Sequence, residues 1–115
     1  PQAVIESVRD LVGAEEDHLV AYMGLGIINS DICWIDIHHT RGSKGGAVSA
    51  LKLDLGVERV ICFGDSDNDL SMFAAADEAY APDNAKDEVK DVATQIIGHH
   101  DEDGIARFLR QRFSL

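Results

Sequence analysis

The sequence predicts an α/β fold in which helices cover both faces of a parallel sheet, preceded by a smaller unit of one helix and two strands. From residue 41 onwards, helical patterns alternate with short apolar segments, which is typical of a parallel sheet whose strands are joined by helices. Residues 60–63 are continuously apolar, as expected of a strand buried on both faces. We therefore predict two parts, residues 1–40 and residues 41–115.

The first part is expected to form a helix followed by an antiparallel pair of strands. Pro1 suits the first turn of the helix, and Gly13 is expected to end it. One face of this helix is apolar, with Val4, Ile5, Val8, Leu11 and Val12. Residues 18–23 and 31–38 have the composition of strands, and a connection rich in Gly and Asn joins them.

The second part is expected to alternate between helices and strands. Ser43 is placed to cap its first helix and Gly56 to end it, while Asp83 or Asn84 is placed to cap its third helix. Ala47, Val48 and Leu51 are expected on the inward face of the first helix. The predicted helices cover residues 44–55, 69–76, 85–93 and 104–112, and the predicted strands cover residues 60–63, 78–81 and 95–97.

The composition is acidic, with 21 acidic and 10 basic residues among 115 and a formal net charge of −11. Such a charge repels nucleic acids and anionic lipids, and no segment reaches the roughly 18 apolar residues of a membrane span. We therefore expect neither nucleic acid nor membrane as a partner. Cys33 and Cys62 each lie in an apolar segment, which favours buried free thiols in a reducing cytoplasm over the alternative of a disulfide.

The residues that predict chemistry directly follow the strand at 60–63, in the segment Gly-Asp-Ser-Asp-Asn-Asp. The carboxyl ends of parallel strands form the usual ligand crevice of such a fold. Asp65 and Asp69 are expected to bring two carboxylates to one point, which favours Mg²⁺ between them, and Asn68 offers an amide donor to a phosphate oxygen. Acids in a first helical turn are also favoured by the helix dipole, so a purely structural role stays open.

Calcium is a poor match for the same segment. Asp65, Asp67 and Asp69 correspond to the first, third and fifth positions of an EF-hand loop. The positions that require Gly and Glu hold Leu70 and Ala76, and the preceding element is a strand instead of a helix. The segment is therefore not expected to bind calcium.

The chain contains two pairs of adjacent histidines. His38 and His39 lie in a predicted strand, so their side chains point to opposite faces and are not expected to share a metal ion. His99 and His100 lie in a polar loop, where solvated side chains are expected rather than ligands.

Lys44 opens a helix inside the segment Arg-Gly-Ser-Lys-Gly-Gly. A lysine at this end of a helix opposes the helix dipole, whereas flanking glycines and free backbone N–H groups suit an anionic ligand. Lys44 is therefore a candidate to neutralise a phosphoryl oxygen or to steady an acidic nucleophile. The alternative is a solvated surface lysine.

Four motifs together resemble the C-terminal part of a haloacid dehalogenase superfamily phosphatase, in the Cof-like sugar-phosphatase branch. They are Ser43-Lys44-Gly45, residues 64–73, Asn84-Ala85 with Val89-Lys90 and Ala93, and residues 102–106. The resemblance covers about residues 30–115, in the family's order and approximate spacing.

The resemblance implies a Rossmann-like core, of which residues 41–115 are the C-terminal half, and residues 1–40 look like the end of the inserted α/β cap. It also implies that Lys44 contacts the substrate phosphate and the nucleophile, and that Asn68 helps to place the phosphoryl group. In the same way, Asp65 and Asp69 would serve Mg²⁺. The implied substrate is a small phosphorylated metabolite.

The sequence departs from the family pattern at its start. No Asp-x-Asp motif followed by Gly and Thr or Ser, which carries the family's nucleophile, occurs there. We therefore expect the chain to be inactive alone, and a non-catalytic binding or assembly module remains the alternative. The strand at 60–63 has predicted neighbours on one side only, so its other edge is expected to be covered by an absent N-terminal segment, a partner chain or a second copy.

Overall fold

The computed structural model describes residues 2–14, 18–25 and 31–115. The chain divides into two compact units, Pro1–Ser43 and Lys44–Leu115, each with a sheet of its own. Within the described ranges, every helix is too short or too polar to cross a membrane.

The first unit consists of helix α1 (Gln2–Ala14), strands β1 (Leu19–Leu25) and β2 (Cys33–His39), and the short 3₁₀ helix η1 (Thr40–Gly42). The two strands pair antiparallel, with Leu19 opposite His39 and Leu25 opposite Cys33, which confirms the predicted strand pair. Helix α1 continues through Gly13 instead of ending there. Pro1 and most of the Gly/Asn-rich connection lie outside the described residues.

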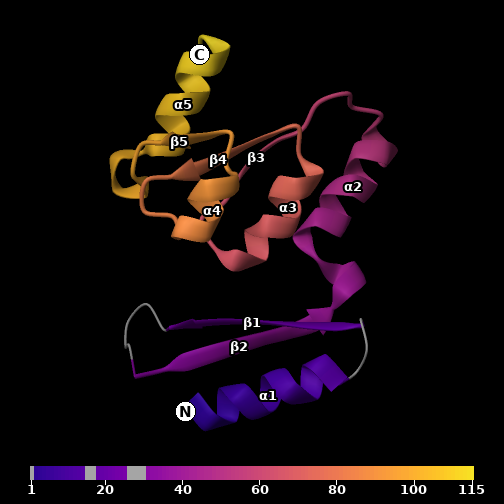
Figure 1. Cartoon of the computed structure of the whole chain (residues 1–115). Helices are drawn as coiled ribbons and strands as arrows, with labels where there is room; N and C mark the ends of the chain where they lie inside the picture. The colour runs from indigo at the N-terminus through magenta and orange to yellow at the C-terminus, as the bar shows by residue number, and fades with distance from the viewer. Residues whose placement is uncertain (1, 15–17, 26–30) are drawn as a thin grey trace. The chain divides into compact units, whose positions relative to one another are not determined.

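The second unit alternates helices and strands as the sequence predicts (Figure 1). Gly56 follows α2 with a φ of 62°, a left-handed conformation that glycine adopts without strain, so this helix ends where predicted. The elements in chain order are α2 (Lys44–Leu55), β3 (Ile61–Phe63), η2 (Asp67–Asp69), α3 (Leu70–Ala75), β4 (Glu78–Pro82), α4 (Asp87–Val92), β5 (Gln95–Ile97), η3 (His100–Glu102) and α5 (Gly104–Phe113).

The sheet of the second unit is parallel, in the order β3-β4-β5. Helices α3 and α4 lie on one face and α5 lies on the other (Figure 1). On the first face, Phe73 and Val89 belong to the same buried cluster as the strand residues Cys62, Ala79 and Ala81. On the second face, the ring of Phe108 in α5 packs on Tyr80 and Phe63, with centroid distances of 4.2 and 5.8 Å. The predicted α/β fold, with helices on both faces of a parallel sheet, is thus confirmed.

Three predictions about local structure are wrong. Ala47 and Leu51 in α2 are exposed, Leu51 by 56%, and Val48 is only half-buried, because α2 packs against α3 and not on the sheet. Neither Asp83 nor Asn84 caps α4; the cap is Lys86, because residues 83 and 84 form a turn closed by the hydrogen bond from Ala85 N to the Pro82 carbonyl, at 2.9 Å. Both cysteines are free, but only Cys62 is buried.

The start of β4 holds a buried carboxylate, that of Glu78. One of its oxygens accepts hydrogen bonds from Arg59 and, at 2.9 Å, from Arg112 of α5, and the other accepts one from the hydroxyl of Tyr80. The bond from Tyr80, and then the two arginines, lower the pKa of Glu78 below its ordinary value. This network joins the start of β4 to α5 and to the segment before β3.

Candidate functional site

The candidate site lies in the second unit, where β3 ends. After Phe63 the chain passes through Gly64 into the 3₁₀ helix Asp67–Asp69, which continues directly as α3. A Cβ atom on Gly64 would lie 2.5 Å from the Cβ of Asp69, so only glycine lets the Asp69 side chain approach the end of the strand. The spacing from Asp65 to Asp69 therefore brings the start of α3 back to the strand end, as the sequence predicts.

Asp69 organises this loop. Its side chain is only 6% exposed, and its Oδ2 accepts hydrogen bonds from the backbone N–H groups of Asp65, at 2.9 Å, and of Ser66, at 3.1 Å. Its Oδ1 accepts a hydrogen bond from the ammonium group of Lys44. A buried carboxylate needs such partners, because an unpaired charge in this position would be expensive to desolvate.

Lys44 reaches the loop from the first turn of α2. Its ammonium group pairs with Asp69 and lies 3.4 Å from Oδ1 of Asn68. A hydrogen bond from the Gly45 N–H to Oγ of Ser71, at 3.1 Å, holds this end of α2 against α3. The two helices are so close here that a Cβ atom on residue 45 would lie only 2.2 Å from the Ser71 carbonyl oxygen. Glycine at position 45 thus permits the close helix approach that brings Lys44 to Asp69.

Asp65 is exposed, whereas Asp69 is buried. The hydroxyl of Ser66 donates to Oδ1 of Asp65 at 3.0 Å, and the backbone carbonyl of Asp65 accepts a hydrogen bond from Lys86 N at 3.0 Å. The ammonium group of Lys86 also pairs with Asp67 at 2.7 Å. Lys86 therefore ties the start of α4 to the loop after β3, a contribution that the sequence did not reveal.

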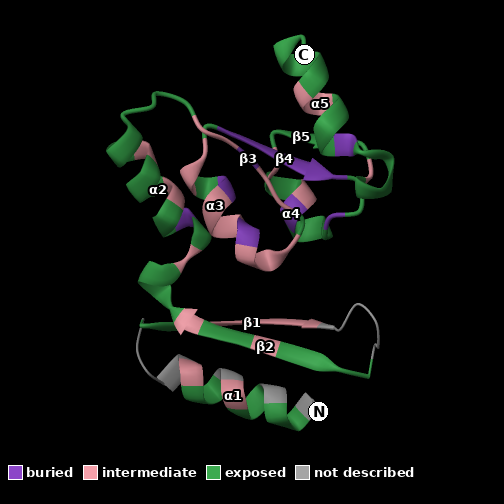
Figure 2. Ribbon diagram, turned by 180° about the vertical axis from the view of Figure 1, so that it is seen from behind, coloured by how far each residue is buried: buried purple, intermediate pink, exposed green. Residues whose placement is uncertain are grey.

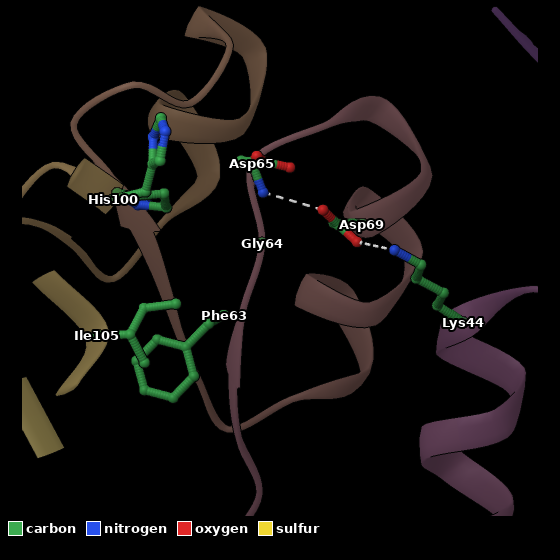
Figure 3. A pocket seen from close by; sticks show the side chains of 8 residues that line it. Lys44, Phe63, Gly64, Asp65, Asp69, His100 and Ile105 are labelled. Atoms are coloured by element: carbon green, nitrogen blue, oxygen red, sulfur yellow. Dashed lines mark hydrogen bonds and ion pairs between the residues drawn. The ribbon is translucent and has the colours of Figure 1, made fainter. Parts of the chain in front are cut away.

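The start of α2 and the loop after β3 contribute side chains to one cleft of about 280 Å³ (Figure 3). The structure brings together Lys44, Asp65 and Asp69 in its wall, with Asn68 beside Lys44; their roles with a metal ion and a phosphate stay predictions. His100, which follows β5, is a lining residue that the sequence reasoning missed; its position just after a strand end was the available signal. The full lining is Lys44, Phe63, Gly64, Asp65, Asp69, Pro82, His100 and Ile105.

The donor set at the cleft suits a hard divalent cation, because carboxylate oxygens are the ligands that Mg²⁺ prefers. Asp65 presents an exposed carboxylate, whereas both oxygens of Asp69 already have protein partners. Asp65 is thus the more accessible ligand, and Asp69 holds the loop and Lys44 in place. Behind the loop, burial and the charge of Asp69 raise the pKa of the Cys62 thiol to about 11, so that it stays protonated at neutral pH.

A family model described as haloacid dehalogenase-like hydrolase matches residues 6–109. The chain belongs to the haloacid dehalogenase-like hydrolase family. A solved structure of this fold, from Streptococcus mutans, superposes on 96% of this chain and 42% of its own chain, with a TM-score of 0.76 and 25% sequence identity.

Phosphatases are among the relatives of this haloacid dehalogenase-like chain. The chain is 48% identical to the 5-amino-6-(5-phospho-D-ribitylamino)uracil phosphatase YitU of Bacillus subtilis over 58 residues, which are 50% of this chain and 22% of that protein. It is 39% identical to the pyridoxal phosphate phosphatase YbhA of Escherichia coli over 77 residues, which are 65% of this chain and 28% of that protein. The chain thus spans about a quarter of the length of these curated relatives.

Proposed function

We propose that this chain is the carboxyl-terminal part of a Mg²⁺-dependent phosphatase that hydrolyses the phosphate monoester of a small metabolite in the cytoplasm. The observation that carries the proposal is the convergence of Lys44, Asp65 and Asp69 on one cleft at the end of β3. An ammonium group and two carboxylates within one cleft provide a place for a phosphoryl group together with its cation.

In this proposal, Asp65 holds Mg²⁺ and Asp69 supports it from the end of the 3₁₀ helix η2. The ion, when bound, neutralises charge on the phosphoryl oxygens. Lys44 contacts another phosphoryl oxygen from the start of α2, and Asn68 donates its amide N–H to the same group. The nucleophile is supplied outside these 115 residues, because the Asp-x-Asp-Gly-Thr type of motif does not occur in them.

The relatives support a small phosphorylated metabolite as the class of substrate. Their names describe phosphatases of an aminouracil ribityl phosphate and of pyridoxal phosphate, which have different ring systems and share a phosphate monoester. The residues of the proposed site would contact that shared group. They therefore suit the class without selecting a member of it.

We also propose that a further strand pairs with the edge of β3 opposite β4. Strand β3 is an edge strand of its three-stranded sheet, and Cys62 at its centre is buried. In the same unit, Leu53 and Leu55 of α2 are 83% and 69% exposed. Exposed apolar residues in a unit whose sheet has β3 at its edge support a sheet that continues beyond β3. The rest of the protein would supply this strand; a partner chain or a second copy of this chain are the alternatives.

Mg²⁺ titration of the chain by calorimetry, combined with a p-nitrophenyl phosphate assay, tests the proposal. We expect weak Mg²⁺ binding without turnover, and binding at least about tenfold weaker in Asp65→Asn, because one of the few protein ligands is lost. Asp54→Asn, on the exposed side of α2, is the matched control and should bind Mg²⁺ as the parent does. Equal binding by Asp65→Asn and the parent would refute the metal assignment.

The longer protein that contains this chain separates the enzyme from the non-catalytic module. An enzyme should hydrolyse phosphate monoesters only with Mg²⁺ and should lose activity in Lys44→Ala and Asp65→Asn. A protein that folds and binds Mg²⁺ but hydrolyses no phosphate monoester would support the module instead. Turnover by the 115-residue chain itself, abolished by Asp65→Asn, would show that it contains a nucleophile of its own.

A further inference from the structure

The loop between β5 and α5 gathers three potential metal ligands that the proposed phosphatase site does not use. His99, His100 and Asp101 each offer one ligand atom, and these atoms all lie within 4.8 Å of one another. Nε2 of His100 lies 2.8 Å from Oδ1 of Asp101, and Nδ1 of His99 lies 3.6 Å from Oδ2 of the same carboxylate. Among the described residues this is the one group of three that meets such a spacing.

The backbone of this loop is held in place by its neighbours. Asn84 accepts a hydrogen bond from His100 N at 3.1 Å, and Nδ1 of His99 accepts one from Asp101 N at 3.1 Å. The two imidazole rings stack with centroids 4.5 Å apart. The donor atoms of the two imidazoles and the carboxylate lie within 4.8 Å of one another, so side-chain rotation would bring them to one ion, and Nδ1 of His99 could take part only by giving up the bond from Asp101 N.

The other pair of adjacent histidines, in strand β2, provides a comparison for the histidines of this loop. His38 and His39 lie in a strand, and their rings stack on different partners, Tyr22 and His18. His39 even accepts a hydrogen bond from the backbone of Arg41, just as His99 does from that of Asp101. Adjacency and capping are therefore common to both pairs, whereas convergence with a carboxylate is found only at His99 and His100 among the described residues.

The chemistry of the cluster favours a borderline transition metal ion over Mg²⁺. Imidazole nitrogen suits zinc, copper and nickel, and zinc binds two histidines and a carboxylate at about 2.0–2.2 Å, which sets its ligands about 3.3 Å apart in a tetrahedron. The three ligand atoms of the cluster lie within 4.8 Å of one another, a spacing that side-chain rotation could bring to that value. Glu102 and Asp103 follow directly and add negative potential, which attracts a cation to this loop.

We propose that His99, His100 and Asp101 form a second cation site, which binds a divalent transition metal ion such as Zn²⁺ through two imidazoles and one carboxylate. Water completes the coordination, because the side chains of His100 and Asp101 are 60% and 73% exposed. The site is separate from the proposed Mg²⁺ site in its ligands. It is adjacent to it in space, because His100 also lines the cleft of Asp65 and Asp69 (Figure 3).

Calorimetric titration of the chain with Zn²⁺ tests the proposal, with the double variant His99→Asn/His100→Asn as the probe. Asparagine retains an acceptor for the backbone of Asp101 but removes both imidazoles. We expect the double variant to bind Zn²⁺ at least about tenfold more weakly than the parent, because one ligand of three remains. The matched control is His38→Asn/His39→Asn, which should bind Zn²⁺ as the parent does.

A spectroscopic measurement on the unaltered chain makes the test independent of any effect of the variants on folding. In nuclear magnetic resonance spectra, Zn²⁺ should shift the imidazole signals of His99 and His100 before those of the other histidines. Asp65→Asn should leave this response unchanged, which distinguishes the site from Zn²⁺ binding at the proposed Mg²⁺ site. The proposal would be overturned if the control variant His38→Asn/His39→Asn lost Zn²⁺ binding while the probe variant His99→Asn/His100→Asn kept it. It would also be overturned if Zn²⁺ shifted no signal of His99 or His100.

Discussion

The two units of the chain differ in how they bury their side chains. All described residues that are buried lie in the second unit, where Phe73, Val89 and the strand residues form a shared core (Figure 2). In the first unit, no described side chain falls in the buried class, and large apolar residues such as Val4, Leu11 and Trp34 are 61%, 70% and 45% exposed.

The difference follows from the architecture. A parallel sheet with helices on both faces encloses its strands, whereas the described part of the first unit has one helix to pack against a two-stranded sheet and so by itself covers less of it. The buried charged side chains are distributed in the same way: those among the described residues, Asp69 and Glu78, are both in the second unit. The second unit therefore holds its candidate site on a packed support, and the first unit presents a more open surface.

The largest expected effect comes from emptying the core of the second unit. Phe73→Ala should lower the free energy of unfolding by about 3–5 kcal/mol, because it leaves a cavity between α3 and the sheet. Val4→Ala on the exposed face of α1 should change it by less than about 0.5 kcal/mol. Urea unfolding followed by circular dichroism measures both, and similar losses would contradict the difference between the units.

A smaller effect is expected from neutralising the buried carboxylate in the loop after β3. Asp69→Asn should cost about 1–3 kcal/mol, because the amide cannot accept all the hydrogen bonds that the backbone N–H groups and Lys44 donate to the carboxylate. Asp36→Asn on the exposed strand β2 should be neutral within about 0.5 kcal/mol. Urea titration of both variants compares a buried with an exposed carboxylate, and a neutral Asp69→Asn would show that the loop does not depend on its charge.

The contribution of Glu78 should depend on pH. Its pKa in the folded chain is lowered below the ordinary value of 4.5, so its stabilisation is complete above that value and is lost as pH falls through the folded pKa. Glu78→Gln should therefore be less stable than the parent at pH 7, and the gap should shrink below pH 4.5. Unfolding curves at several pH values measure this gap, and a constant gap would exclude the ionised carboxylate as its cause.

Thiol labelling compares the exposure of one cysteine in each unit and is expected to leave the fold unchanged. Cys33 in the first unit is exposed and should react with Ellman's reagent in the native chain. Cys62 is buried and its pKa is raised to about 11, so it should react only after unfolding. Cys33→Ser should remove the fast reaction, and fast labelling that persists in this variant would show that the second unit opens readily.

Local patterns in the sequence were sufficient for the element order. The apolar segment at 60–63 predicted a strand, although Cys62 is its one buried residue, and the glycine at 56 predicted the end of α2, because both signals act within a few residues. The rule that ligand sites lie at the carboxyl ends of parallel strands was sufficient to place Asp65 and Asp69 at the cleft, whereas the position of Lys44 beside them was only implied by the family resemblance. Their roles with Mg²⁺ and phosphate stay predictions.

Contacts between residues far apart in sequence were decided only by the tertiary structure. An apolar segment does not reveal whether anything covers it, which is why Cys33 was expected to be buried and is exposed. A loop sequence does not reveal what lies beside it, so the positions of His100 in the cleft and of Lys86 on Asp65 were missed. The sequence by itself determined which segments become helices and strands, because propensity and periodicity are local; packing decided which side chains are covered and which meet, because both depend on the other elements.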